Sequence, residues 1–194
     1  MRRITLLVVC TLALALCAGS AWAQSPPPAD TLKVDYFSNA NTAGAPDGTL
    51  RVSNPGTSPN GNLCASVFVF DIHQEMSECC SCLVTPDGLR TFSVNTDLTS
   101  NPLTGKTLNQ GVIKVVSMNT VNGTCPLPTS FSSRTTPSIR AWTTHIQNSN
   151  FAITETASSD ASLSWAEIAR LGRQCTAIAL DGSGSGICSC GTGD

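Results

Sequence analysis

The chain has 194 residues, of which 41% are hydrophobic and only 12% are charged, about half the charged fraction of ordinary globular proteins. A chain of this length can bury about 70% of its surface as one domain. The charges are scattered singly and sum to −2, so the sequence offers no basic patch for nucleic acid or an anionic membrane.

The first 23 residues predict a secretory signal peptide. Two arginines at positions 2 and 3 precede an apolar run from Ile4 to about Ala18, and small residues then lead to Ala23. A membrane anchor is the alternative, but the run is shorter than the roughly 20 residues that span a bilayer. We expect cleavage after Ala23, secretion to the extracellular space or periplasm, and no membrane span in the mature chain.

Residues 24–30 form a proline-rich lead, which we expect to be flexible or extended because proline cannot donate to a β ladder. A single domain is predicted over residues 31–194. Ser and Thr make up 43 of the 171 residues from position 24 onward. This composition suits a β-rich extracellular protein, because Thr favours strands and Ser is common in turns.

Six segments predict β-strands. Residues 31–37 alternate apolar and polar side chains, the pattern of a half-buried strand, and residues 63–72 are the most apolar stretch of the mature chain. The other four are residues 49–53, 89–94, 111–118 and 138–146. Turn-rich segments, not helices, separate these strands. The spacing therefore predicts a mainly β fold, an antiparallel β-sandwich that is immunoglobulin-like in general architecture.

One region predicts an α-helix, residues 164–180. Ser164 followed by Glu167 forms a capping box at its start. Four side chains fall on one face and are expected to pack on the β-strands: Ile168, Leu171, Cys175 and Ile178. Asp181-Gly182 ends the helix, and a tail rich in Cys and Gly follows over residues 181–194.

Beyond the signal peptide the chain has eight cysteines: Cys64, Cys79, Cys80, Cys82, Cys125, Cys175, Cys188 and Cys190. Their even number in an exported chain predicts four disulfides. Adjacent Cα atoms lie about 3.8 Å apart, short of the roughly 4.4–6.8 Å that a relaxed disulfide needs, so Cys79 and Cys80 must have different partners. In an extended segment Cys80 and Cys82 share a face and Cys79 lies on the other.

The sequence does not select the pairing, but it indicates a cluster. We expect the cysteines at 79, 80 and 82 to bond to the helix or tail through those at 175, 188 and 190. A glycine-rich tail loses much entropy on ordering and has little apolar surface to offset the loss, whereas a disulfide contributes about 2–4 kcal/mol.

The segment before these cysteines, "HQEMSECCSC" from position 73, contains a candidate ligand patch of His73, Glu75 and Glu78. We expect this patch to lie beside the disulfide-bonded tail. A metal site from His73, Cys79, Cys82 and a tail cysteine is the alternative to disulfides. A solvated loop of charges is the ordinary outcome for such a segment.

No catalytic constellation is recognisable. The chain has two histidines, His73 and His145, and it lacks the Gly-x-Ser-x-Gly elbow, the His-Glu-x-x-His motif and a phosphate loop. His145 lies on the predicted strand 138–146, where a hydrogen-bonded structural histidine is expected. We therefore assign no catalytic residue, no metal and no cofactor.

These observations favour a secreted, disulfide-stabilised, non-catalytic β protein with a binding, cell-surface or structural role. An extracellular protein or a glycan is the expected kind of ligand. Two alternatives stay open: a metal-binding protein that uses His73 and the cysteine cluster, and a secreted hydrolase with an unrecognised site. The hydrolase would require a cleft in which one of the two histidines meets a carboxylate and a Ser or Thr hydroxyl.

Overall fold

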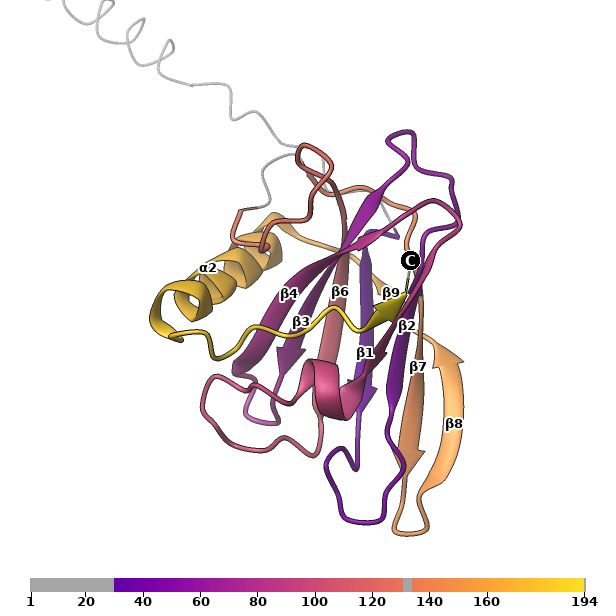
Figure 1. Ribbon diagram of the computed structural model, residues 1–194, viewed down its shortest axis with the longest axis vertical. Helices are drawn as coiled ribbons and strands as arrows, with labels where there is room; N and C mark the ends of the chain where they lie inside the picture. Colours follow the sequence, from indigo (N-terminus) through magenta and orange to yellow (C-terminus); the bar gives the residue numbers. More distant parts are fainter. Residues whose placement is uncertain (1–29, 131–133, 194) are drawn as a thin grey trace, which may run out of the picture.

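The computed structural model describes residues 30–130 and 134–193 (Figure 1). The predicted signal peptide, residues 1–23, and residues 24–29 of the lead lie outside the described residues. The described chain is mainly β, with two antiparallel sheets and one C-terminal helix. None of its helical segments combines the length and apolarity needed to cross a bilayer.

The strands are β1 (Leu32–Phe37), β2 (Thr49–Ser53), β3 (Leu63–Phe70), β4 (Met76–Val84), β5 (Leu89–Ser93), β6 (Gly111–Asn119), β7 (Arg140–Gln147), β8 (Ala152–Ala157), β9 (Ser159–Ala161) and β10 (Thr192–Gly193). A π-helical turn, η1, covers Val94–Leu98, and the helix α2 covers Trp165–Asp181. One sheet has the order β4-β3-β6-β1-β9 and the other β10-β5-β2-β7-β8.

All six predicted strands and the predicted helix are confirmed, as β1, β2, β3, β5, β6, β7 and α2. Four strands were missed. β4 contains "SECCSC", which composition alone marks as polar and cysteine-rich, and every residue of β8 is exposed, so β8 has no buried face to give an alternating pattern. β9 and β10 have only three and two residues.

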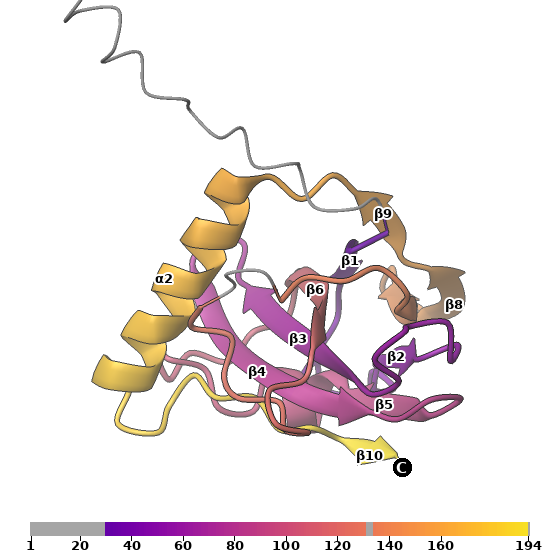
Figure 2. The ribbon, with the colours of Figure 1, turned by 90° about the horizontal axis from the view of Figure 1, so that it is seen from above.

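Two clusters of buried side chains make the core. The larger cluster contains residues of both sheets, among them Val67 and Ile113 of one sheet and Leu50 and Phe92 of the other. The second cluster joins the opposite face of the β4-β3-β6-β1-β9 sheet to α2, which covers that face in Figure 2. The outer face of the other sheet is not covered by a helix in the described part of the chain.

Helix α2 buries the face that its sequence predicts: Ile168, Leu171, Cys175 and Ile178. The Ser164 hydroxyl accepts a hydrogen bond from the backbone N–H of Glu167 (3.1 Å), and Gly182 ends the helix. The Glu167 carboxylate binds Lys114 and Arg170 (2.7 Å each). Of the two hydrogen bonds of the predicted capping box, the one that Ser164 accepts is therefore confirmed.

On one side, a single continuous segment connects the two sheets, and we call it the strand crossover (residues 152–161). Its first part, β8, pairs with β7, and its second part, β9, pairs with β1. Ser158 lies at the change of sheet, where its N–H donates to the Ala141 carbonyl (2.9 Å) and its hydroxyl donates to Asp35 (2.8 Å).

On the opposite side, the tail connects the sheets, and we call this region the disulfide seam. Cys80–Cys188 and Cys82–Cys190 bond the tail to β4, while β10 pairs with β5 of the other sheet. Figure 2 shows the tail running from α2 to β10 beside β5.

The remaining bridges are Cys79–Cys175, which bonds β4 to α2, and Cys64–Cys125. All three cysteines of β4 therefore bond to the helix or tail, as predicted. The expected facing is also found, because Cys80 and Cys82 belong to the inter-sheet cluster and Cys79 to the cluster under the helix.

Candidate functional site

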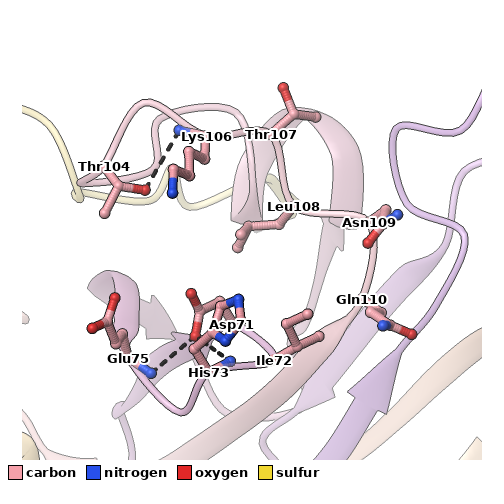
Figure 3. A pocket seen from close by; sticks show the side chains of 10 residues that line it. All are labelled: Asp71, Ile72, His73, Glu75, Thr104, Lys106, Thr107, Leu108, Asn109 and Gln110. Atoms are coloured by element: carbon pink, nitrogen blue, oxygen red, sulfur yellow. Dashed lines mark hydrogen bonds between the residues drawn. The ribbon is translucent and has the colours of Figure 1, made fainter.

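The structure separates the three residues of the predicted ligand patch. His73 and Glu75 are exposed in the turn between β3 and β4, where the Asp71 carboxylate accepts hydrogen bonds from both of their backbone N–H groups (2.8 and 2.9 Å). Figure 3 shows these residues on one wall of a pocket of about 170 Å³, with Lys106 and Leu108 on the facing loop. The pocket is small and contains charges of both signs.

Glu78 lies apart from this pocket, in β4, and is completely buried, so the expectation of an exposed loop through residue 78 is wrong. Its Oε1 accepts a hydrogen bond from the Asn101 N–H (3.0 Å), and Oε2 has no hydrogen-bond partner in the described structure. Burial raises the pKa of Glu78 to about 7. Asn101 also donates to the carbonyls of Gly184 (2.8 Å) and Ile187 (3.2 Å), which connects Glu78 to the tail.

A metal site of the predicted kind needs thiolate ligands. All eight cysteines of the described residues are in disulfides, so none is a thiolate. Across residues 30–130 and 134–193, no three side chains of His, Cys, Asp or Glu gather around a point where a metal ion could bind. A site from His73 and the cysteines would require reduction of the bridges first.

The other histidine, His145 on β7, forms a cluster with β1 and the strand crossover. Its Nε2 lies 2.8 Å from the Thr156 hydroxyl and 3.3 Å from Oδ1 of Asp35. Asp35 also accepts hydrogen bonds from the Ser158 hydroxyl (2.8 Å) and the Tyr36 N–H (2.9 Å). His145 is only 2% exposed, and the side chain of Asp35 is 8% exposed. His145 and the Asp35 carboxylate are therefore largely buried, whereas Thr156 on β8 is exposed.

This cluster brings together the groups that the hydrolase alternative requires, but not in the order of a nucleophile relay. In such a relay the carboxylate and the hydroxyl contact opposite nitrogens of the imidazole. Here Asp35 and Thr156 both contact Nε2, and Nδ1 is buried without a hydrogen-bond partner among the described residues. If Nε2 is protonated and donates a hydrogen bond to Asp35, the same nitrogen has no lone pair left to accept the proton of the Thr156 hydroxyl.

Beside this cluster lies an open pocket of about 430 Å³, whose lining includes Val34, Tyr36, Val112, Gln147, Thr156 and Ser159. The Tyr36 ring stacks on the His145 imidazole, with 4.2 Å between centroids and 26° between planes. The Tyr36 hydroxyl accepts a hydrogen bond from the Gln147 amide (3.1 Å), and the residue is 45% exposed. The ring is thus held at two points while much of it faces solvent.

A second pocket, of about 370 Å³, adjoins the first at Val112. Its other lining residues are Phe70, Asp71, Gln74, Lys114 and Arg170, and both cations lie over the Phe70 ring, 5.3 and 5.2 Å from its centroid. We call the two pockets together the Tyr36 groove. Hydrogen bonds from Arg170 and Lys114 lower the pKa of Glu167 to about 2, so this end of the groove holds an ionised and paired cluster.

Comparison with protein-family models, with curated proteins and with solved structures finds no match to this chain. The residues themselves therefore carry the functional argument.

Sequence reasoning missed this groove. It treated Asp35 and Tyr36 as members of a strand and His145 as a structural histidine, and it made no prediction for Thr156. The Tyr36–His145 contact joins β1 and β7 of different sheets, and no local pattern reports such a contact. The one local signal for the groove was the pair Asp35-Tyr36, an acidic residue next to an aromatic one on a strand that alternates apolar and polar side chains.

Proposed function

We propose that the protein is a secreted, non-catalytic binding protein and that the Tyr36 groove is its ligand site. The observation that carries this proposal is the His145 cluster, in which the carboxylate and the hydroxyl share one imidazole nitrogen. With the Nε2 proton directed at Asp35, the imidazole has no lone pair that faces the Thr156 hydroxyl. An adjoining open groove with aromatic, apolar and polar lining is the usual character of a ligand site.

Export is part of the proposal. Four disulfides and the absence of a membrane-spanning helix in the described residues are consistent with a secreted protein. We also propose that the two sheets form a β-sandwich, immunoglobulin-like in general architecture. The inter-sheet core supports the sandwich, because it draws side chains from both sheets.

A secreted hydrolase is the second candidate, and the meeting of Asp35, His145 and Thr156 favours it over any other reaction class. The test is to incubate the oxidised mature protein with chromogenic esters, chromogenic glycosides and an unfolded protein substrate. Turnover at the rate of the buffer blank is expected. Turnover that Thr156→Val abolishes and Trp142→Ala retains would instead establish the hydrolase, since Trp142 lies on β7 outside the groove lining.

A further inference from the structure

The charges in the Tyr36 groove are already satisfied within the protein. Lys114 and Arg170 both bind the Glu167 carboxylate at 2.7 Å. Asp35 accepts hydrogen bonds from Ser158 and Tyr36 beside its contact with His145, and Asp71 accepts them from two backbone N–H groups of its own turn. An ionic ligand would have to compete with these partners and lose its own hydration. The groove therefore favours a neutral ligand.

The free surface of the groove is an aromatic ring with a polar rim. Tyr36 is fixed by stacking on His145 and by its hydrogen bond from Gln147, so little conformational entropy is lost when a ligand covers it. An aromatic ring offers a flat apolar surface with partial negative charge, which matches the C–H face of a pyranose ring.

Groups that can bind hydroxyls surround the ring. The Gln147 amide and the hydroxyls of Thr156 and Ser159 line the same pocket as Tyr36. Each keeps capacity for further hydrogen bonds, because an amide has four sites and a hydroxyl has three. A ligand that is apolar on one face and carries many hydroxyls at its edge uses both parts of this lining.

The adjoining pocket extends the groove past Val112 toward Gln74 and the stems of Lys114 and Arg170. Each pocket alone falls in the range of about 300–1,000 Å³ that is typical of small-molecule sites. Because the two pockets share Val112, together they offer room for more than one ring.

We propose that the Tyr36 groove binds a neutral oligosaccharide of two or more sugar rings, with one ring against Tyr36. This inference rests on the proposed binding function and gives its ligand a chemical class. The side chains that specify it are Tyr36 as the stacking surface and Gln147, Thr156 and Ser159 as hydroxyl partners.

The experiment is a titration of the oxidised mature protein with trisaccharides, followed by heteronuclear NMR and calorimetry. The neutral panel contains trimers of glucose in α- and β-linkage, N-acetylglucosamine, xylose and mannose, and trigalacturonate is the anionic probe. At least one neutral trimer is expected to bind with a dissociation constant of roughly 10 μM to 1 mM, a usual range for small ligands. Raising NaCl from 50 to 500 mM is expected to leave this affinity unchanged.

Two variants of Tyr36 and one control variant test whether the sugar binds in the Tyr36 groove. Tyr36→Ala is expected to weaken binding at least about tenfold, while Tyr36→Phe, which keeps the ring, weakens it about threefold or less. Trp142→Ala is the matched control, because it removes an exposed aromatic from β7 outside the groove lining, and binding is expected to be unchanged. Thermal unfolding of each variant verifies that it is folded.

Three results would overturn the inference: no neutral trimer binding at about 10 mM, about tenfold above the weakest dissociation constant expected; salt-sensitive preference for trigalacturonate; or binding lost in Trp142→Ala and kept in Tyr36→Ala. The proposed function fails separately. If a bound sugar is cleaved, the non-catalytic proposal is wrong and the sugar site stands. If only an extracellular protein or peptide perturbs the NMR signals of the groove, the sugar inference is wrong and the binding function stands.

Discussion

The two sheets are joined on both sides, but by different kinds of bond. At the strand crossover one segment pairs with β7 and then with β1, so backbone hydrogen bonds make the joint. At the disulfide seam the tail meets β4 through two disulfides and two backbone hydrogen bonds at Cys79, and it meets β5 through only two residues of β10. Covalent bonds therefore take the place of most of a ladder where the chain is too rich in glycine to offer side chains for packing.

The two sides of the molecule also differ in how well they protect the edge strands of the sheets. Unpaired edge strands are prone to pair with other chains. The tail runs beside β4, and β10 pairs with β5. β8, by contrast, is an edge strand of six exposed residues without proline or lysine. The disulfide seam thus protects its side of the molecule more completely than the strand crossover does.

The largest expected effect comes from breaking the disulfide seam. Replacing all four of its cysteines, Cys80, Cys82, Cys188 and Cys190, by Ala should lower the free energy of unfolding by about 3 kcal/mol, the value for closing a loop of about 15 residues. The loop is that short because Cys79–Cys175 still joins β4 to α2, 13 positions before Cys188. Urea unfolding under non-reducing conditions measures the change. An unchanged midpoint would show that the non-covalent contacts of the tail hold it without the two disulfides.

The strand crossover should be broken by Ser158→Pro, which removes the N–H that donates to Ala141 and the hydroxyl that donates to Asp35. We expect a loss of about 2–3 kcal/mol from the two hydrogen bonds and the proline geometry. Ser158→Ala keeps the N–H and should cost only about 1 kcal/mol. Equal losses in the two variants would mean that the backbone bond at the crossover contributes nothing.

A smaller effect is expected from Glu78, the buried carboxyl group that Asn101 connects to the tail. Burial raises the pKa of Glu78 from 4.5 to about 7, so the folded state retains a proton that the unfolded chain loses between these values. The free energy of unfolding should therefore fall as the pH rises from about 4.5 to 7. Glu78→Gln should remove this dependence and stabilise the protein by about 1–2 kcal/mol at pH 8, with little change at pH 4.

Urea midpoints across this pH range test the Glu78 prediction. Asn101→Ala is a control, because it retains the backbone N–H that binds Glu78 and removes the side-chain bonds to the tail. It should lower the midpoint at every pH without altering the pH dependence. If the urea midpoint of Glu78→Gln changes with pH as that of the wild type does, a group other than Glu78 causes the pH dependence.

The smallest effect is expected from removing one bridge of the seam. Cys80→Ala with Cys188→Ala leaves Cys82–Cys190 intact two positions away on each chain, so almost no loop closure is lost. The free energy of unfolding should fall by less than about 1 kcal/mol, which is less than half of the loss expected when all four cysteines of the seam are replaced. A loss equal to half would show that the two bridges act independently.

The elements that the sequence predicts are those whose buried and exposed faces follow a local rule. β3 is apolar except for Ser66, β2 alternates, and α2 follows its N-cap Ser164 and carries an apolar stripe, so each shows a local pattern. β8 lies exposed at an edge, and its position depends on pairing with β7. The cysteine cluster was predictable because geometry forbids a bond between Cys79 and Cys80, and because the tail needed an attachment.

The candidate site was not predictable in the same way. Glu78 was expected in a loop with His73, but pairing of β4 with β3 buries it, and that pairing is a property of the sheet. The Tyr36 groove forms where β1, β6, β7 and the strand crossover meet. Its two aromatic rings are 109 positions apart in the chain, and only the arrangement of the two sheets brings them within stacking distance.

The pairing of β4 also bears on how the protein would mature if it is exported as proposed. Exported chains cross a membrane from the N-terminal side, so Cys64 and the three thiols of β4 would reach an oxidising compartment before Cys175 and the tail cysteines. Any bond that formed in that interval, other than Cys64–Cys125, would be non-native. Thiol–disulfide exchange would have to replace such a bond before native pairing is reached.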